Sequence, residues 1–502
     1  MRTGSTQAIL PPVSEPFQPA HADFLRDESR RAGRADRIAF PRSEADVLDA
    51  LAEARSLGLP LTAQGARTGV AGGAVPEGGL VLNLSRMDKI LSVSDDEMRV
   101  QPGATLSAVR AAAPHARFFA PDPTETSASI GGMVSCNSSG ALSFRYGPTR
   151  NHVLALRVAT LSGEILDLRR GRDRADGLRF ALGPLSGELP PIPRPAVKNA
   201  AGYFVDPGMD LLDLFVGAEG TLGIVLEATL RLLPAPGAVW GLMAFLPNAA
   251  SVVGFVDALR AAPRDAPAPL AALEYFDARC LAFLRDRSAE LAAMNVPLPD
   301  VPPGASCVYA EWHAPDSPSA EQALLAAADL LPRFGADPDA CLLADNPHDM
   351  EKLKLFRHAA PELVNAAIDL RRKTHPALTK LGTDMSVPDS RLADLLALYE
   401  TDLAAAGLEH LVFGHVGANH LHANVLSRDM DDYAAGKALL RKWAAQVVEW
   451  RGSISAEHGV GKLKRELFAL MAGPDALRQT RALKQTFDPL FLLNPGTLLD
   501  PP

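Results

Sequence analysis

The alternation of apolar and polar positions predicts one early helix followed by several short strands. In SEADVLDALAEARSLG (43–58) the apolar residues from Val47 onward recur at helical spacing, and Ser43 is a suitable N-cap. The runs GGLVLNLS and EMRVQPG, separated by Gly- and Asp-rich turns, indicate strands. The stretch NHVLALRVATLSGEILDL alternates closely enough to form two strands joined at Ser162-Gly163.

The remainder of the chain mixes helices and strands without a regular order. Residues 170–196 predict a long surface loop, and a helix-to-strand segment then ends at Pro234, so we place a boundary near residue 236. Strands such as SCVYAEWH and LEHLVFGH alternate with Ala-rich helices predicted at 251–262, 319–332, 390–406 and 433–450. This irregular mixture favours an α+β fold over a regular βαβ array.

Composition narrows the class of protein. The chain has 502 residues, 47% hydrophobic and 22% charged, which is typical of a globular protein with more than one domain. The net charge of −9 predicts no nucleic-acid partner. None of the four Cys forms a C-x-x-C pair, which argues against a disulfide framework or an iron–sulfur cluster. Without a long apolar run or the apolar core of a signal peptide, the predicted location is cytoplasmic. The charge run RDESRRAGRADR is interpreted as a solvated face.

Two glycine-rich loops carry the first functional signal. They are PLTAQGARTGVAGG (60–73) and SASIGGMVSCNSSG (127–140). Glycines leave backbone N–H groups uncovered, and such groups bind phosphate oxygens. Neither loop matches the P-loop or the G-x-G-x-x-G dinucleotide motif. A tight turn remains the alternative for either loop alone, but the pair favours a pyrophosphate held between them.

These loops belong to a longer series of motifs. VQPG (100–103), PDP (121–123), RYGPTRNHV, KNAAGY (198–203), GAEGTLGIV and LNPGT (493–497) accompany them in order. The series resembles the FAD-binding domain of the vanillyl-alcohol-oxidase and p-cresol-methylhydroxylase superfamily, in the branch of D-lactate, D-2-hydroxyglutarate and glycolate dehydrogenases. The resemblance implies an N-terminal extension (1–36), a two-subdomain FAD-binding domain (37–236), an α+β cap or substrate domain (237–430) and a C-terminal helical segment closing on the flavin (431–502).

The resemblance also implies which residues contact FAD, from its pyrophosphate to its flavin ring. They are Gly65, Arg67, Thr68, Gly69, Pro121, Thr124, Ser127, Gly131, Gly132, Asn137, Ser138, Glu219, Gly223, Ile224 and Asn494. Relatives with covalent flavin use a His or Cys near these loops. Here the first loop has neither and Cys136 is the nearest thiol, so we expect FAD to be bound non-covalently.

The segment LVFGHVGANHLHANV (411–425) carries the second functional signal. His420 and His422 have strand spacing, whereas His415 has the opposite parity, so a turn must redirect it if all three are to meet. Downstream, GSISAEHGVG places Glu457 and His458 between glycines. Histidine with carboxylate is ligand chemistry for Zn²⁺ or a similar divalent ion. Hydrogen-bonded core histidines are the alternative interpretation.

The family comparison assigns roles in this region. Its G-H-x-G-D-G-N-x-H-x-N and E-H-G segments match His415, His422 and Glu457 as metal ligands and His458 as general base. Ala418, Asn419 and His420 replace the usual Asp, Gly and Asn, so we expect a more weakly held metal, with His420 as an additional ligand or a partner of the substrate.

Two cations resemble groups that orient the substrate carboxylate in this family: Arg357, which matches the arginine of a W-x-x-R-E segment, and Lys380, which precedes DMSVP. Pro361 stands where relatives have Thr, so substrate specificity does not transfer.

The resulting hypothesis is an FAD-dependent dehydrogenase that oxidises a D-2-hydroxy acid to the 2-oxo acid. Hydride would pass to flavin N5, with a metal lowering the hydroxyl pKa and His458 accepting the proton. Electrons would then leave for an external acceptor: an electron-transfer flavoprotein, a cytochrome, a quinone or oxygen. Two alternatives stay open, an alkyl-glycerone-phosphate-synthase-like FAD enzyme and a non-catalytic FAD-binding subunit of a larger oxidase. A homodimer also stays open.

Overall fold

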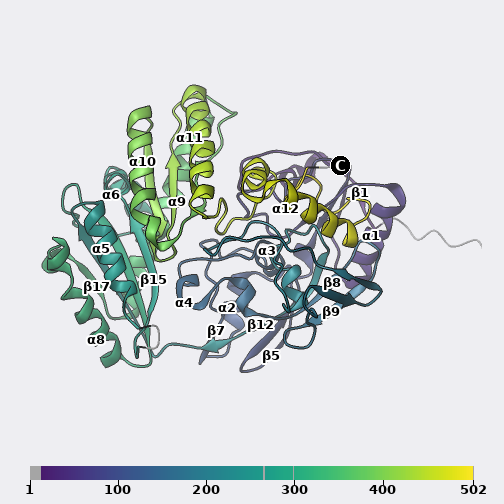
Figure 1. Ribbon diagram of the computed structural model, residues 1–502, viewed down its shortest axis with the longest axis horizontal. Coiled ribbons are helices and arrows are strands. Elements are labelled where there is room, and N and C mark those ends of the chain that lie inside the picture. The colour runs from purple at the N-terminus through teal and green to yellow at the C-terminus, as the bar shows by residue number, and fades with distance from the viewer. Residues whose placement is uncertain (1–12, 264–265, 298, 501–502) are drawn as a thin grey trace, which may run out of the picture.

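The computed structural model describes residues 13–263, 266–297 and 299–500, which form two units side by side (Figure 1). We call residues 13–234 together with the C-terminal helix α12 (Arg465–Phe487) the N-terminal unit, and residues 238–449 the cap unit. Figure 1 shows α12, in yellow, lying on the N-terminal unit although it comes last in the chain. This return brings segments far apart in the sequence together around the region between the units.

A four-stranded sheet begins the N-terminal unit, with strand order β1-β2-β4-β3. The strands are β1 (Glu15–Pro16), β2 (Arg37–Ala39), β4 (Leu80–Asn83) and β3 (Leu61–Gln64). Helix α1 (Glu44–Leu57) follows β2, and the Ser43 side chain accepts a hydrogen bond from the Asp46 N–H, as expected of an N-cap. The helix ends where Gly58 adopts a φ of 62°, a conformation that glycine reaches without strain. The prediction of this helix is confirmed.

A five-stranded antiparallel sheet completes the unit, with order β5-β6-β12-β8-β9. Its strands are β5 (Ile90–Val93), β6 (Glu97–Val100), β12 (Ile224–Arg231), β8 (Val153–Ala159) and β9 (Ile165–Arg169). Other elements of this unit are α2 (Leu106–Ala112), α3 (Ile130–Cys136), α4 (Ser143–Tyr146) and the pair β7 (Arg117–Phe118) with β13 (Leu233–Pro234). Strands β8 and β9 confirm the predicted pair joined at Ser162-Gly163.

The expectation of a long loop over 170–196 is wrong in part. Strands β10 (Arg179–Leu182) and β11 (Leu185–Glu188) form a hairpin there, with Gly183 in the turn at a φ of 57°. Phe180 is buried and stacks on Phe487 of α12, with ring centroids 5.8 Å apart. The alternation of Phe180 and Leu182 marks a strand, but it is too short to stand out between charged and Pro-rich flanks.

The charged run after residue 25 is also not the solvated face that we expected. Arg30 forms an ion pair with Asp369 of the cap unit at 2.9 Å, and Asp27 and Ser29 are buried. A neighbouring side chain, Phe24, lies under the Arg67 guanidinium, 4.4 Å from its ring centroid. This segment therefore covers the first glycine loop and contacts both units.

The cap unit is built on an eight-stranded antiparallel sheet, ordered β17-β14-β16-β15-β20-β21-β18, with β19 also pairing with β21. The strands are β14 (Ala238–Leu246), β15 (Leu270–Phe276), β16 (Ser306–Ala314), β17 (Leu342–Ala344), β18 (Leu381–Gly382), β19 (Met385–Ser386), β20 (His410–His415) and β21 (His420–Val425).

Seven helices are described in the cap unit. They are α5 (Ala249–Arg260), α6 (Ala278–Arg285), α7 (Ser288–Ala293), α8 (Ser317–Ala328), α9 (Pro347–Arg372), α10 (Leu392–Ala406) and α11 (Met430–Glu449). α5, α8, α10 and α11 correspond to the four helices predicted from the Ala-rich stretches. α11 contacts β18 and β19, whereas α12 packs on the N-terminal unit, so the predicted C-terminal segment is shared between the two units.

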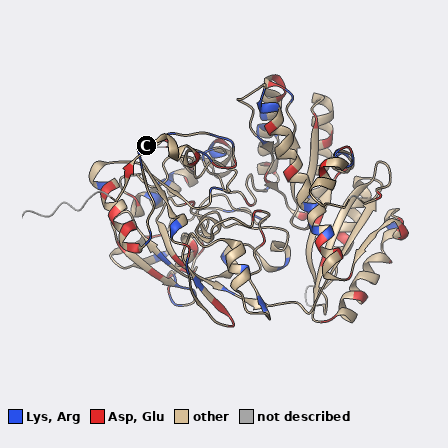
Figure 2. Cartoon of the chain, turned by 180° about the vertical axis from the view of Figure 1, so that it is seen from behind, with Lys and Arg blue, Asp and Glu red and all other residues tan. Residues whose placement is uncertain are grey.

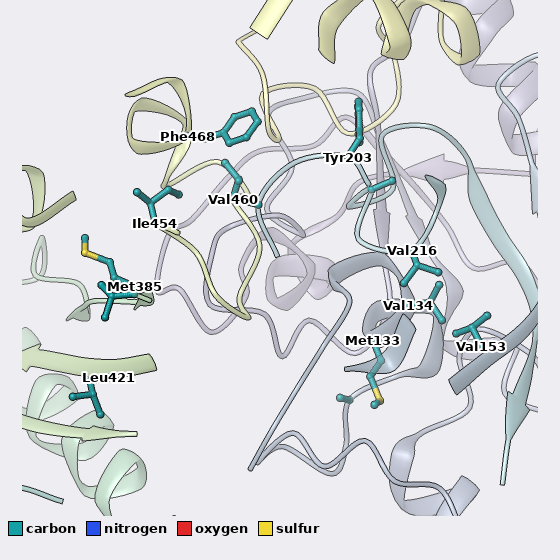
Figure 3. Close-up of a cluster of buried hydrophobic side chains, with 14 of the residues drawn as sticks. Met133, Val134, Val153, Tyr203, Val216, Met385, Leu421, Ile454, Val460 and Phe468 are labelled. Carbon is teal, nitrogen blue, oxygen red and sulfur yellow. The ribbon is translucent and has the colours of Figure 1, made fainter. Parts of the chain in front are cut away.

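One hydrophobic core spans both units. It includes Met133 and Val134 of α3, Leu421 of β21, and Ile454 and Val460 of the loop that precedes α12. Figure 3 shows Ile454 and Val460 between the α3 side chains and those of the cap sheet. The loop from 452 to 464 is therefore anchored by burial on both sides of the functional residues that it carries.

The surface carries charges of both signs, as the composition leads us to expect. Lys and Arg are interspersed with Asp and Glu along the elements of both units (Figure 2). Within the described ranges, no helix is both long and apolar enough to cross a membrane.

Candidate active site

A hairpin brings the three histidines together. Strands β20 and β21 pair so that His415 lies opposite His420 and Phe413 opposite His422. The turn at 416–418, followed by Asn419 at a φ of 50°, redirects the chain as the strand parity requires. The ring centroids of His415 and His420 are 5.3 Å apart, and those of His420 and His422 are 4.4 Å apart. The predicted convergence of the three rings is confirmed.

Glu457 lies against two of these rings. Its Oε1 is 3.2 Å from His415 Nε2 and 3.2 Å from His422 Nε2. The other ring nitrogen of each histidine is already held, His415 Nδ1 by Glu274 at 2.8 Å and His422 Nδ1 by the Thr383 carbonyl at 2.8 Å. Metal-ligating histidines are oriented in this way. The ligand set His415, His422 and Glu457 thus fits a divalent ion.

Two further side chains hold the second carboxylate oxygen of Glu457. Oε2 accepts hydrogen bonds from Lys198 Nζ at 2.7 Å and Ser139 Oγ at 3.1 Å. Although burial acts in the opposite direction, His415 and Lys198 hold the pKa of Glu457 well below its usual range. Burial likewise lowers the pKa of His415, but Glu274 and Glu457 outweigh it and raise that pKa to about 9. Without a metal, a proton on His415 partly balances the two carboxylates.

Asp384 positions the loop that carries Glu457 and His458. Its Oδ2 accepts from Lys464 Nζ at 2.6 Å, from Ser455 Oγ at 2.6 Å and from the His458 N–H at 3.1 Å. Burial opposes ionisation, but His458 and Lys464 keep the pKa of Asp384 well below its usual range. The fixed carboxylate leaves this loop little freedom to move.

His458 lies where it can act on a ligand. Its ring stacks on His422 with centroids 5.4 Å apart, and Nε2 is 3.5 Å from Glu457 Oε1. The side chain is 35% exposed and lines two adjoining cavities. Burial lowers the pKa of His458 to about 4, so the neutral ring can accept a proton at neutral pH.

His420 is placed differently from the other histidines. It is 0% exposed, with Nδ1 3.2 Å from Lys198 Nζ and Nε2 2.9 Å from Asp384 Oδ1. Burial lowers the pKa of His420 well below its usual value. It lies within reach of the metal-ligand set but lines none of the cavities described below. Its contacts support Lys198 and Asp384, and its roles as ligand or base stay predictions.

Ala418 lines a cavity whose wall also includes His415 and Glu274. The Nδ1 atoms of His415 and His422 have Glu274 and Thr383 as partners. The expectation that the metal is held more weakly without the Asp of relatives stays a prediction.

The two predicted cations lie in a cavity of about 180 Å³ beside the histidines. Arg357, from α9, is 3.9 Å from Asp122 and has a buried Nη1 without a hydrogen-bond partner among the described residues. Burial disfavours its charge, yet Glu274 and its other neighbours raise the pKa of Arg357 overall. Burial lowers the pKa of Lys380 to about 8. Both can face an anionic ligand.

A cavity of about 690 Å³ joins the glycine loops to this site. Gly65 allows the loops to meet, because a Cβ there would lie 2.0 Å from Ser129 Oγ, and that hydroxyl accepts from the Ala66 N–H. Twelve of the predicted FAD residues line the cavity: Gly65, Arg67, Thr68, Gly69, Thr124, Gly131, Gly132, Ser138, Glu219, Gly223, Ile224 and Asn494. His415, Glu457 and His458 line its far part, so a long cofactor can reach the histidines.

Three predicted FAD residues lie outside this cavity wall. Pro121 is buried, and its carbonyl accepts a hydrogen bond from Arg110. The exposed Ser127 lies in the turn before α3. Asn137 ends α3 at a φ of 50° and accepts from the Arg150 N–H at 2.9 Å. Of the three, Asn137 has a side chain that holds a neighbouring backbone group, and their contact with FAD stays a prediction.

Two of the lining residues hold the site together. The Glu219 carboxylate accepts from the N–H groups of Val460 and Gly461, and Asn494 binds the Ala63 N–H and the Glu219 carbonyl. Cys136 also lines the cavity, where burial raises the pKa of its thiol to about 12. A thiol held in this protonated form is a poor nucleophile.

Sequence reasoning missed three residues of this site. Lys198 and Asp384 lie inside quoted motifs, KNAAGY and DMSVP, and a charge within such a motif was the available signal. Glu274 is a single acid in the otherwise apolar strand LAALEYF, and a buried carboxylate needs a partner. The identity of that partner, His415, was not visible from the sequence.

Comparison with known proteins agrees with this geometry. A model of the FAD binding domain matches residues 35–169, and one described as FAD linked oxidases, C-terminal domain, matches residues 242–498. The chain is 31% identical to D-2-hydroxyglutarate dehydrogenase of Xanthomonas citri pv. viticola, over 99% of this chain and 96% of that protein. It is 29% identical to D-lactate dehydrogenase of Anaerostipes hadrus, over 95% and 92% respectively.

The solved structures show the same architecture. An alkyldihydroxyacetonephosphate synthase superposes with a TM-score of 0.65 at 16% identity, covering 97% of this chain and 83% of that one. Fold and site together define an FAD-dependent oxidoreductase. More specifically, the chain belongs to the family of FAD-linked oxidases, which confirms the superfamily suggested by the glycine loops.

Proposed function

We propose that the protein oxidises a D-2-hydroxy acid to the 2-oxo acid. The observation that carries this proposal is the placement of Glu457 Oε1 3.2 Å from both His415 Nε2 and His422 Nε2, beside the neutral His458 and at the end of the FAD cavity. Relatives named as D-2-hydroxyglutarate and D-lactate dehydrogenases support the substrate class. The particular acid is not specified by these contacts.

The residues divide the work as follows. His415, His422 and Glu457 would hold a divalent ion, most simply Zn²⁺, which supplies Lewis acidity toward the substrate oxygens. The residues lining the larger cavity would hold FAD, which supplies the hydride acceptor. His458 takes the hydroxyl proton at its ring nitrogen as the C–H bond breaks. Arg357 and Lys380 orient the carboxylate end, the guanidinium by hydrogen bonds and the ammonium as a point charge.

Anaerobic flavin bleaching tests the proposal. With D-lactate, D-2-hydroxyglutarate, glycolate or a longer D-2-hydroxy acid, flavin absorbance near ~450 nm should fall as hydride reaches the cofactor. Bleaching by none of these acids would contradict the proposal. It would favour either a synthase-like transferase, for which the solved neighbour supplies only the fold, or a non-catalytic FAD-binding subunit.

The electrons must then leave the reduced cofactor. The four cysteines do not supply a cluster motif, so we propose an external acceptor: an electron-transfer flavoprotein, a cytochrome, a quinone or oxygen. Reoxidation rates of the bleached protein with each class would rank these acceptors.

We expect FAD to be bound non-covalently. The first loop has no His or Cys, and the nearby Cys136 thiol is protonated. Acid or heat denaturation should therefore release all yellow colour into the supernatant. Flavin that remains with the washed precipitate would contradict this expectation.

Arg357→Ala is expected to weaken substrate binding more than it slows chemistry. Removing a buried, charge-paired contact costs roughly 2–5 kcal/mol. The concentration of acid that half-saturates flavin reduction should therefore rise, with a smaller change in the limiting rate. Arg279→Ala, which removes an exposed arginine paired with Glu400, is the matched control. An unchanged half-saturation concentration in Arg357→Ala would remove this residue from the binding role.

A further inference from the structure

A second large cavity, of about 630 Å³, also reaches the histidines. Its wall includes Ser139, Arg150, Arg194, Lys198, His415 and Ala418, but no residue of the first glycine loop. We propose that this cavity is the channel through which an anionic hydroxy acid reaches the site. The inference rests on the proposed function and adds the route that the substrate takes.

The channel adjoins the reacting site directly. Ala141, Glu274 and His415 line both this cavity and the 180 Å³ cavity beside His458. Ser139 and Gly140 separate it from the FAD cavity, since both line the two spaces. Bound FAD would occupy the cavity that both glycine loops line, whereas this cavity contains no residue of the first loop and only Asn137, Ser139 and Gly140 of the second.

Three cationic side chains line the channel. The exposed fraction of the side chain is 27% for Arg194, 12% for Arg150 and 13% for Lys198, whose Nζ contacts Glu457. Both arginines lie over the ring of Phe204, at 3.8 Å and 4.1 Å from its centroid, which keeps them beside the cavity. Guanidinium groups stacked on a ring in this way are held in place.

The wall also carries acidic groups. They are Asp389, whose side chain is 89% exposed, and Glu274, which is paired with His415. The three cations are themselves ion-paired, Arg194 with Asp206, Arg150 with Asp213 and Lys198 with Glu457, and these partner acids do not line the cavity. The cations therefore offer a passing carboxylate N–H donors inside ion pairs, and salt weakens such contacts.

The first test neutralises the outermost cation. In Arg194→Gln, flavin reduction by D-lactate or D-2-hydroxyglutarate in a stopped-flow instrument should show a second-order rate lowered about two- to fivefold at low salt. The limiting rate at saturation should stay at the parental value, and the rate should depend less on salt. The double variant Arg194→Gln with Asp206→Asn keeps the net charge of the pair. Comparing it with Arg194→Gln separates the effect of net charge from the effect of losing the guanidinium group. Arg179→Gln, an exposed cation of β10 outside the channel, should behave like the parent.

The second test narrows the channel. Ala418 lines this cavity but not the FAD cavity, so Ala418→Trp should keep its flavin while its second-order rate falls without a change in salt dependence. Should this variant fail to fold, Arg194→Gln still decides the matter.

Three different outcomes would each overturn the proposal, and they can be told apart. If flavin reduction in every channel variant depends on acid concentration as it does in the parent, the proposed route is wrong. If the channel variants reduce their flavin at the parental rate but reoxidise it more slowly, the route is also wrong, and the cavity is assigned to the electron acceptor. Failure of every acid to bleach the parent's flavin overturns the proposed function itself, and the proposed route with it.

Discussion

His458→Asn is expected to retain FAD and still bind the hydroxy acid, while flavin reduction slows by about 10²–10⁴-fold. The neutral ring, whose pKa burial lowers to about 4, lines both cavities, and under the proposed function it would take the hydroxyl proton. Asparagine approximates the size of the ring but cannot accept a proton at neutral pH.

Rapid mixing under anaerobic conditions separates this effect from binding. The rate at saturation should fall, whereas the half-saturation concentration should stay near that of the parent. His348→Asn, an exposed histidine at the start of α9, serves as the control. Reduction of the His458→Asn flavin at the parental rate would show that His458 is structural.

Glu457→Gln is expected to lose the divalent ion. The amide keeps the shape but removes the charge that faces His415 and His422, and it leaves Lys198 without its carboxylate partner. Loss of an outer partner of a metal ligand typically costs 10–100-fold in affinity, so loss of a ligand's charge should cost more than about 100-fold. Elemental analysis after dialysis should find a stoichiometric ion in the parent and almost none in the variant.

Ala418→Asp is the matched test in the opposite direction. Position 418 and His415 line the same cavity, so restoring the residue of relatives should make the ion harder for a chelator to remove. The flavin spectrum confirms that each variant is folded. Active parent enzyme that contains no stoichiometric ion would contradict the metal site, and the histidines would then act as hydrogen-bond donors to the substrate.

Local pattern was sufficient for many elements of the fold. The spacing after Ser43 predicted α1, because its N-cap and the following apolar stripe lie within one segment. The hairpin of β10 and β11 was missed because Phe180 is buried against Phe487, some three hundred residues later. A strand stabilised by such a distant partner has only a weak local signal.

The candidate site could likewise be predicted only where its residues lie in short segments of the sequence. Residue types and spacing in two short Gly-containing segments indicated a histidine–carboxylate site, and the resemblance to the family implied His415, His422 and Glu457 as ligands and His458 as base. The position of His420, buried between Lys198 and Asp384, depends on three separate segments of the chain.

By itself, the sequence determined the α+β class through its mixture of helix and strand patterns. It indicated the cofactor loops, the histidine–carboxylate chemistry and the family through contiguous motifs. Tertiary structure alone decided that the Glu457 carboxylate lies against His415 and His422, and that Lys198 and Ser139 hold its Oε2. It also decided that Ala418 lines a cavity together with His415. The physical reason is that hydrogen-bond partners and burial depend on which distant segments meet. In this protein those segments meet where the loop before α12 packs between two units.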